Sequence, residues 1–204
     1  MKGLLIVLEG INGCGKSSII SNLSNHLKSI GETVVVYKFP DRTGKFGSQI
    51  DNHLQKKEVF EYKYDLLSAF AANRLAVRNK IIQEIRDGCI VICDRYFFSG
   101  IAYQIPLNVS KKVIKRYNTV LSYFDKTMPI PDITYLIQGD HLHLRNETTQ
   151  RYHYNSMAAH QLFDIFREVI QLNTNKYILL KNEYGKLDSA VMFIINDINM
   201  RRCV

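Results

Sequence analysis

The sequence predicts a three-layer α/β fold, in which helices flank a central five-stranded parallel sheet. Two observations predict it. Short apolar segments of strand length alternate with longer segments of helical periodicity along the whole chain. A glycine-rich turn joins the first predicted strand to the first predicted helix, as in phosphate-binding α/β proteins. The 204 residues, of which 46% are apolar, fit a single domain over 1–204 with one sizeable core.

The N-terminal part of the chain has the pattern of a strand–helix–strand unit. Residues 3–8 form an uninterrupted apolar run, which is typical of a strand buried on both faces of a parallel sheet. Apolar residues recur at helical spacing over 19–30, and Gly31 follows where a helix end is expected. Residues 33–37 supply a second strand, so this part is predicted to be a βαβ unit.

The same alternation continues to the C-terminal part of the chain. Further strands are predicted at 90–93, 133–137 and 177–180. Further helices are predicted at 48–55, 61–87, 110–124, 157–172 and 187–198, with Ser110 as an N-cap. Residues 139–156 are polar and without periodicity, which indicates a lid between a strand and a helix.

Composition narrows the location and the partners of the protein. No apolar run reaches the ~18 residues that span a bilayer, and the first run is too short for a secretory signal. The four cysteines lack paired spacing, which favours a reducing compartment, so we expect a cytoplasmic protein without membrane contact. The formal charge of +8 favours anionic partners, but we interpret the basic clusters at 111–116 and 201–202 as solvated faces and expect no nucleic-acid binding.

The strongest motif is a phosphate-binding loop. Residues 10–17 match G-x-x-x-x-G-K-[ST] between a predicted strand and a predicted helix. Glycines let backbone N–H groups surround phosphate oxygens, Lys16 reaches the β- and γ-phosphates, and Ser17 holds Mg²⁺. The motif therefore predicts a bound nucleoside triphosphate. The residues expected to contact it are Gly10, Ile11, Asn12, Gly13, Cys14, Gly15, Lys16, Ser17 and Ser18.

Charged residues follow other predicted strands at the same edge of the sheet. Asp94 comes directly after 90–93, where parallel-sheet enzymes place site residues, and this favours a metal-binding role over a helix cap or a surface ion pair. Arg42, Arg74 and Arg95 follow or face strand ends, as expected if two anionic substrates meet there.

One helix face combines an aromatic residue with an arginine. Phe70 and Arg74 lie four residues apart, so they share a face of the predicted helix. Such a pair could stack on a nucleobase and hydrogen-bond its edge, although a core phenylalanine beside a solvated arginine is the commoner arrangement.

Five segments together resemble the thymidylate kinase family, with matching order and spacing over nearly the whole chain. They are 10–17, 39–44, 70–74, 94–103 and 129–132. The resemblance implies the P-loop nucleoside-monophosphate-kinase fold with a lid over about 139–156. It also implies transfer of the γ-phosphoryl group of Mg·ATP to dTMP, which yields dTDP for dTTP synthesis. The compact chain and its divergent loop look most similar to forms carried by large cytoplasmic DNA viruses.

The resemblance implies a binding pocket for dTMP. Phe70 would stack on thymine, and Arg74 would hydrogen-bond its carbonyl group. Tyr103 would lie where a ribose 2′-hydroxyl would clash, which selects deoxyribose. The other residues expected in this pocket are Asn12, Phe39, Arg42, Asn73, Arg95, Ser99 and Tyr152. Asn12 replaces the usual aspartate and Leu75 a common tryptophan, so selectivity between dTMP and dUMP stays open.

The resemblance also implies electrostatic catalysis without a covalent intermediate. Arg42 and Arg95 would bind the acceptor monophosphate, and Asp94 would hold Mg²⁺ through water. Gly13 stands where the cellular eukaryotic form often has an arginine, so a lid arginine would stabilise the transition state. The residues expected to act in catalysis are Lys16, Arg42, Asp94, Arg95, Arg145 and Arg151.

Two other functions remain open from the sequence. A deoxynucleoside (thymidine) kinase needs a general base for a neutral 5′-hydroxyl, and Asp41 could serve only if Arg42 held no phosphate. A nucleic-acid-dependent ATPase would explain the charge of +8 and predicts stimulation by DNA, but the short chain leaves little room for a nucleic-acid module.

The family resemblance also implies a homodimer formed through helices beside the sheet. The predicted helix 61–87 could supply the interface, because it carries four large apolar residues. They are Leu66, Leu67, Ile81 and Ile85. The same residues could instead face the core.

Overall fold

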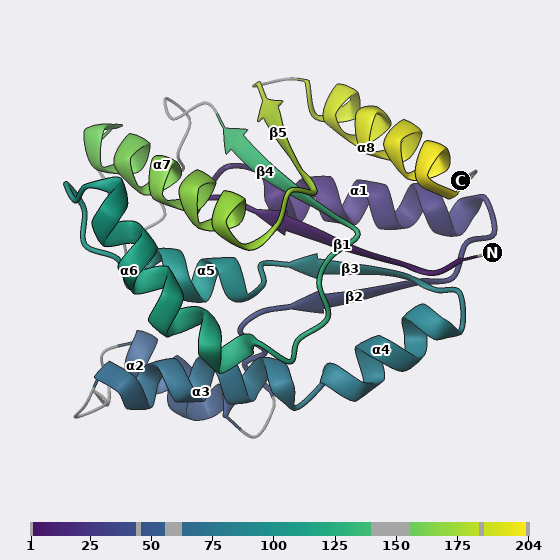
Figure 1. Ribbon diagram of the computed structural model, residues 1–204. Coiled ribbons are helices and arrows are strands. Elements are labelled where there is room, and N and C mark those ends of the chain that lie inside the picture. The colour runs from purple at the N-terminus through teal and green to yellow at the C-terminus, as the bar shows by residue number, and fades with distance from the viewer. Residues whose placement is uncertain (1, 44–45, 56–62, 140–155, 184–185, 203–204) are drawn as a thin grey trace.

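The computed structural model describes residues 2–43, 46–55, 63–139, 156–183 and 186–202 (Figure 1). Its centre is one sheet of five parallel strands in the order β2-β3-β1-β4-β5. The strands are β1 (Leu4–Glu9), β2 (Val34–Lys38), β3 (Ile90–Asp94), β4 (Ile133–Gly139) and β5 (Tyr177–Asn182). The predicted five-stranded parallel sheet is therefore confirmed.

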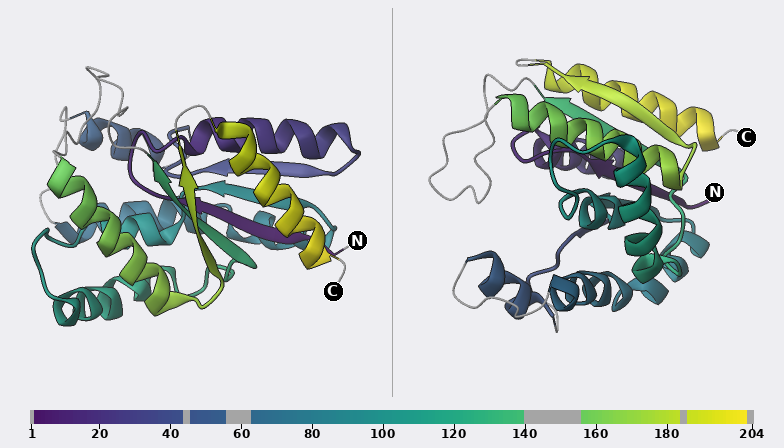
Figure 2. Two further views of the ribbon diagram at one scale, coloured as in Figure 1. Left: turned by 90° about the horizontal axis from the view of Figure 1, so that it is seen from above. Right: turned by 60° about the vertical axis from the view of Figure 1, so that its left-hand side comes forward.

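Helices cover both faces of the sheet, which gives the predicted three layers (Figures 1 and 2). Helices α1 and α8 pack together on one face, while α4, α5 and α7 lie on the other, with α6 against α7 and α3 against α5. The helices are α1 (Lys16–Ser29), α2 (Gly47–Leu54), α3 (Lys63–Leu75), α4 (Arg78–Arg86), α5 (Phe97–Ala102), α6 (Lys111–Leu121), the 3₁₀ helix η1 (Ser122–Asp125), α7 (Ser156–Asn173) and α8 (Leu187–Arg202).

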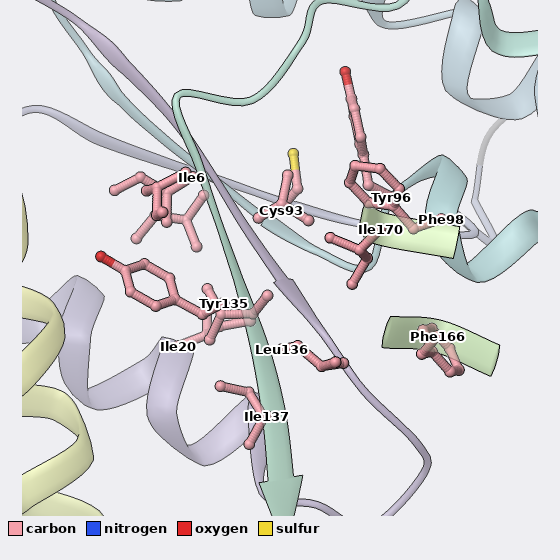
Figure 3. Close-up of a cluster of buried hydrophobic side chains, with 14 of the residues drawn as sticks. Ile6, Ile20, Cys93, Tyr96, Phe98, Tyr135, Leu136, Ile137, Phe166 and Ile170 are labelled. Carbon is pink, nitrogen blue, oxygen red and sulfur yellow. The ribbon is translucent and has the colours of Figure 1, made fainter. Parts of the chain in front are cut away.

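The core lies on both sides of the central strands. Every residue of β1 and β3 is buried, as expected for strands with helices on both faces. Along β4, Tyr135 and Ile137 point to the α1 side and Leu136 points to the α7 side, where Phe166 and Ile170 lie (Figure 3). This alternation follows from the two-residue period of a strand.

The strand register brings the predicted site segments to one edge of the sheet. Leu8 of β1 pairs with Asp94 of β3, and Lys38 of β2 pairs with the same aspartate. The segments after these three strands, which begin at Gly10, Phe39 and Arg95, therefore leave the sheet side by side.

The single predicted helix over 61–87 is wrong, because the chain turns at residues 76–77 between α3 and α4. The break lets α3 contact α5 and η1 while α4 packs against β3. Leu67 and Ile81 are thereby buried in the core on separate helices. Of the two alternatives given for these residues, a dimer interface or the core, Leu67 and Ile81 therefore follow the second.

Two smaller predictions also need correction. The helix predicted over 110–124 continues after Leu121 as η1, and Ser110 stands at the N-cap without a side-chain capping bond. Helix α5 was not predicted, because six residues are too few to display helical periodicity. The expected helix end at Gly31 is confirmed by its positive φ of 88° and by its N–H, which donates to the Lys28 carbonyl at 3.0 Å.

No helix among the described residues is both long enough and apolar enough to cross a bilayer. Most of the predicted lid, 140–155, lies outside the described residues, and so do Arg145, Arg151 and Tyr152.

Candidate active site

The phosphate-binding loop connects β1 to α1 and depends on its glycines. Gly10, Gly13 and Gly15 have φ values of 143°, 80° and 92°, which residues with a Cβ rarely adopt. The first turn of α1 carries no acidic residue and no side-chain cap, so the positive end of the helix dipole faces the loop. Backbone N–H groups and a positive dipole at one place are what phosphate oxygens need.

Asn182, at the end of β5, supports the loop from outside and was not predicted. Its Nδ2 donates a hydrogen bond to the Cys14 carbonyl at 2.9 Å. A Cβ on Gly15 would lie 2.1 Å from that nitrogen, so a larger residue at position 15 would displace the Asn182 side chain from this hydrogen bond. A polar residue at the end of a predicted strand was the available signal.

Lys16 lies within the loop. Its Nζ donates hydrogen bonds to the carbonyls of Gly10 at 3.0 Å and Ile11 at 2.8 Å, and it lies 3.4 Å from Cys14 Sγ. Burial lowers the pKa of the Lys16 ammonium group, and the neighbouring Arg95 guanidinium acts in the same direction. The loop therefore holds a desolvated cation, which interacts strongly with a phosphate.

Ser17 and Asp94, the two residues predicted to bind magnesium, lie within hydrogen-bond distance of each other. Ser17 Oγ donates a hydrogen bond to Asp94 Oδ2 at 3.2 Å. The contact follows from the register between β1 and β3, which sets Asp94 beside the start of the loop. A hydroxyl and a carboxylate beside a phosphate site are oxygen ligands that suit Mg²⁺.

Arg95 joins the phosphate-binding loop to α5. Its backbone has a positive φ of 70°, which costs about 1–3 kcal/mol in a residue with a Cβ. Nη1 donates to the Gly10 carbonyl at 2.9 Å and to Ser99 Oγ at 3.1 Å, and Nη2 donates to Asn12 Oδ1. The guanidinium also lies 5.4 Å from the ring centre of Tyr103. Four predicted site residues are thus brought together around one loop carbonyl.

Glu9 organises this cluster from beneath and was missed by the sequence reasoning. Its side chain is fully buried, and its carboxylate accepts hydrogen bonds from Tyr96 N–H at 2.8 Å, Ser99 N–H at 3.1 Å and Ser99 Oγ at 2.5 Å. Burial raises the pKa of Glu9, while Arg95 and these hydrogen bonds oppose that shift. A carboxylate between an apolar strand and a glycine turn was the available signal, because a buried charge needs partners.

Asn73 and Arg42 lie on the side of the site formed by the segment after β2. The Asn73 side chain accepts a hydrogen bond from Asp41 N–H at 2.8 Å and donates one to the Asp41 carbonyl at 2.7 Å. Arg42 instead pairs with Asp51 of α2 at 3.0 Å, with 57% of its side chain exposed. Asn73 therefore holds the backbone next to Arg42, and Arg42 is not part of the Arg95 cluster.

Phe39 and Phe70 differ in their surroundings. Phe39 is 3% exposed and packs between the rings of Tyr37 and Tyr96, at centroid distances of 6.3 and 6.2 Å. Phe70 is only half-buried and lines a cavity together with Arg74. Phe70 is thus the more accessible of the two predicted aromatic residues.

Arg74 is buried, contrary to the solvated arrangement that is commoner on a helix face. Its guanidinium forms a bidentate ion pair with Asp125 of η1. Asp125 was not predicted, because it lies 51 residues away along the chain. An acid directly after the last apolar residue of the helix predicted over 110–124 was its only signal.

The sequence profile of the thymidylate kinase family matches residues 8–185, which include all of these clusters. The chain belongs to the thymidylate kinase family. It is 34% identical to thymidylate kinase from Schizosaccharomyces pombe over 140 residues, which are 68% of this chain and 62% of that protein. It is 36% identical to thymidylate kinase from Brachyspira hyodysenteriae over 149 residues, which are 72% of this chain and 66% of that protein. The likeness to viral forms stays a prediction.

Other comparisons differ in the share of the chain that they cover. The match to thymidylate kinase from Danio rerio is 35% identical over 102 residues, half of this chain and 48% of that protein. The chain thus spans about half to two thirds of these relatives' lengths. Thymidylate kinase structures from Candida albicans and Ehrlichia chaffeensis match with TM-scores of 0.72 and 0.69.

The two structures cover 98% of this chain, and it covers 93% and 99% of theirs, at 23% and 21% identity. These structural matches confirm the P-loop nucleoside-monophosphate-kinase fold. The nucleotide that a thymidylate kinase of this fold takes is decided by its side chains, because one fold can carry several activities.

Proposed function

We propose that this chain is a thymidylate kinase that transfers the γ-phosphoryl group of Mg·ATP to dTMP and forms dTDP. The observation that carries the proposal is the cluster at the carboxyl ends of β1 and β3. There a desolvated Lys16, the Ser17–Asp94 pair and Arg95 surround the phosphate-binding loop. One cation would serve the donor triphosphate, and a second, which donates to the same Gly10 carbonyl from another element, would serve another anion.

The loop residues fit ATP and Mg²⁺. The backbone N–H groups of 10–18 would bind the ATP phosphates, and the Ser17 hydroxyl and Asp94 carboxylate would hold Mg²⁺. When bound, the metal neutralises charge on the phosphate oxygens. Lys16 would exchange its carbonyl partners for phosphate oxygens and follow the transferred group.

Arg95 and Arg42 would bind the monophosphate of the acceptor. Arg95 is held by Gly10 and Ser99, so it presents its charge with little loss of conformational entropy. Arg42 would leave its ion pair with Asp51, which costs little because exposed pairs contribute only about 0–1 kcal/mol. Catalysis then consists of positioning two anions and stabilising the charge between them.

The remaining pocket would bind the nucleoside of dTMP. Phe70 would stack on thymine, Arg74 would hydrogen-bond the base, and Tyr103 would lie against deoxyribose. Asn12, Phe39, Asn73 and Ser99 would complete the pocket. The predicted lid residues Arg145, Arg151 and Tyr152 lie outside the described residues.

Thymidine kinase activity is less well supported. It needs a general base for the neutral 5′-hydroxyl, whereas a phosphate acceptor is already ionised. The candidate base Asp41 uses Oδ1 to accept hydrogen bonds from Thr43 N–H at 2.9 Å and Thr43 Oγ1 at 2.7 Å. These bonds give its carboxylate a role in the turn after β2.

Family membership further supports a cytoplasmic homodimer. Because Leu67 and Ile81 are in the core, the dimer interface would use other residues. Light scattering during gel filtration is expected to give twice the chain mass of 23.6 kDa. A mass of 23.6 kDa would contradict the dimer.

Release of ADP from Mg·ATP tests the proposed activity directly. The purified protein is given dTMP, dUMP, thymidine or single-stranded DNA, each separately. We expect dTMP to give the fastest turnover. Turnover with thymidine but not dTMP would support a nucleoside kinase, and release stimulated only by DNA would support a nucleic-acid-dependent ATPase.

A further inference from the structure

Arg74 and Asp125 form an ion pair next to the proposed base pocket. Among the described residues, no other ion pair is as deeply buried. Arg74 Nε donates to Asp125 Oδ1 at 2.7 Å, and Nη2 donates to Oδ2 at 2.6 Å. The side chains are only 4% and 3% exposed. The pair therefore joins α3 to η1 with fixed bidentate geometry.

A buried ion pair of this kind is weak evidence for a stabilising role. Removing two charges from water costs several kcal/mol per ion, and a packed apolar pair is often as stable or more stable. The same cavity is lined by Leu67, Ile101 and Leu121, so an apolar pair would suit its surroundings. A charged pair at this place is better explained by recognition of a polar ligand.

The geometry leaves one edge of the guanidinium for such a ligand. An arginine has five N–H donors, and Asp125 takes one on Nε and one on Nη2. Within the described part of the chain, Nη1 has no hydrogen-bond partner. A Cβ on Gly100 would lie 3.1 Å from Nη2 and 3.3 Å from Nη1, so α5 packs closely on the same guanidinium. Phe70 lines the same cavity one helical turn earlier.

We propose that Asp125 is a positioning residue that fixes Arg74 as a donor to a base carbonyl and thereby sets base selectivity. This inference rests on the proposed thymidylate kinase function. A fixed N–H group donates to the 4-carbonyl of thymine or uracil, whereas the 4-amino group of cytosine is itself a donor and leaves it unpaired. Sites built around such hydrogen bonds reject the unpaired analogue strongly.

The test compares Asp125→Asn with Asp197→Asn. Asp197 also pairs with an arginine, Arg201 at 2.8 Å, but it lies on α8 at the other face of the sheet. For both variants we would measure the melting temperature, the KM for ATP, kcat and KM with dTMP and dCMP, and calorimetric binding of dTMP without ATP.

Asp125→Asn is expected to raise the KM and Kd for dTMP by about 10-fold, because one charged hydrogen-bond partner of Arg74 is lost. The preference for dTMP over dCMP in kcat/KM should fall by about 10-fold as Arg74 loses its fixed position. The KM for ATP should not change. Asp197→Asn should lower the melting temperature but leave every kinetic constant and the preference unchanged.

A second variant keeps the test decisive if Asp125→Asn folds poorly. Asp125→Glu keeps the negative charge and an ion pair with Arg74, but its longer side chain displaces the guanidinium from the present bidentate position. This variant should melt near the wild-type temperature and show a reduced preference for dTMP over dCMP. Suppose that the wild type is active on dTMP and that either variant folds but keeps the wild-type preference. This inference is then overturned, while the proposed function stands. If the wild type does not use dTMP, the proposed function and this inference are overturned together.

Discussion

The donor half and the acceptor half of the candidate site are held in different ways. In the donor half, one contiguous loop supplies the backbone N–H groups, Lys16 and Ser17, and Asp94 and Asn182 contact this loop from the ends of β3 and β5. In the acceptor half, Arg74 and Asn73 are each held by a partner from another element, Arg74 by Asp125 and Asn73 by the backbone of Asp41. The donor half should therefore fail when the loop itself is changed. The acceptor half should fail when distant partners are changed.

The largest expected effect is in the donor half. Lys16→Ala should lower kcat by about 10³-fold, because it removes the cation that stabilises the transferred phosphoryl group. The measurement is ADP release at saturating dTMP. Lys28→Ala, an exposed change in the last turn of the same helix, is the matched control and should retain wild-type turnover. Binding of dTMP by the Lys16 variant should stay near the wild-type value, and its loss would contradict the separation of the two halves.

Glu9 lies at the end of β1, next to the loop of the donor half, and its carboxylate binds Tyr96 and Ser99 on the acceptor side. Its substitution therefore tests whether the two halves respond independently. Glu9→Gln should lower kcat/KM for dTMP by about 10-fold and cost about 1–3 kcal/mol of unfolding free energy, because glutamine presents an amino group where one Glu9 oxygen accepts from Ser99 Oγ. Acceptor kinetics and urea unfolding would measure the two effects. If the KM for ATP rises as much as the KM for dTMP, Glu9 supports the whole site rather than the Arg95 side.

The buried carboxylate of Glu9 also predicts a pH dependence. Its pKa in the folded protein is raised above the ordinary value of 4.5, mainly by burial, so the folded state binds its proton more tightly than the unfolded state. The stabilising contribution is fully present below pH 4.5 and is lost as the pH rises through the folded pKa. The unfolding free energy of the wild type minus that of Glu9→Gln should therefore fall as the pH rises above 4.5. A difference that is constant across this pH range would contradict the raised pKa.

The residues of the site differ in how well they can be predicted from the sequence. The loop 10–17 and Asp94 were predictable, because a contiguous motif and a strand end are local features. Glu9 and Asp125 were not, since their partners are defined only when separate elements pack together. The turn at Val77 was hidden for the same reason, because local periodicity does not show that α3 and α4 pack against different neighbours.

A smaller effect is expected from the segment after β2. Asn73→Ala should raise the KM for dTMP by about 5-fold, because two hydrogen bonds to the Asp41 backbone are lost and Arg42 is held less well. Steady-state kinetics would measure it, with exposed Asn79→Ala of α4 as the control. An unchanged KM for dTMP would show that Arg42 does not depend on this anchor.

The smallest effect concerns Asp51, the partly buried partner of the exposed Arg42. Asp51→Asn should lower the KM for dTMP by about 2-fold and leave the melting temperature nearly unchanged, because exposed ion pairs are weak. The same kinetic assay and a thermal melt would measure it. A large rise in the KM for dTMP would mean that the pair holds Arg42 in its binding position.

Product analysis by phosphorus NMR tests the central claim most directly. The purified protein is incubated with Mg·ATP and dTMP, and the nucleotides are followed over time. The proposed activity predicts equal amounts of ADP and dTDP, with each dTDP formed at the expense of one dTMP. Formation of ADP without dTDP would contradict it.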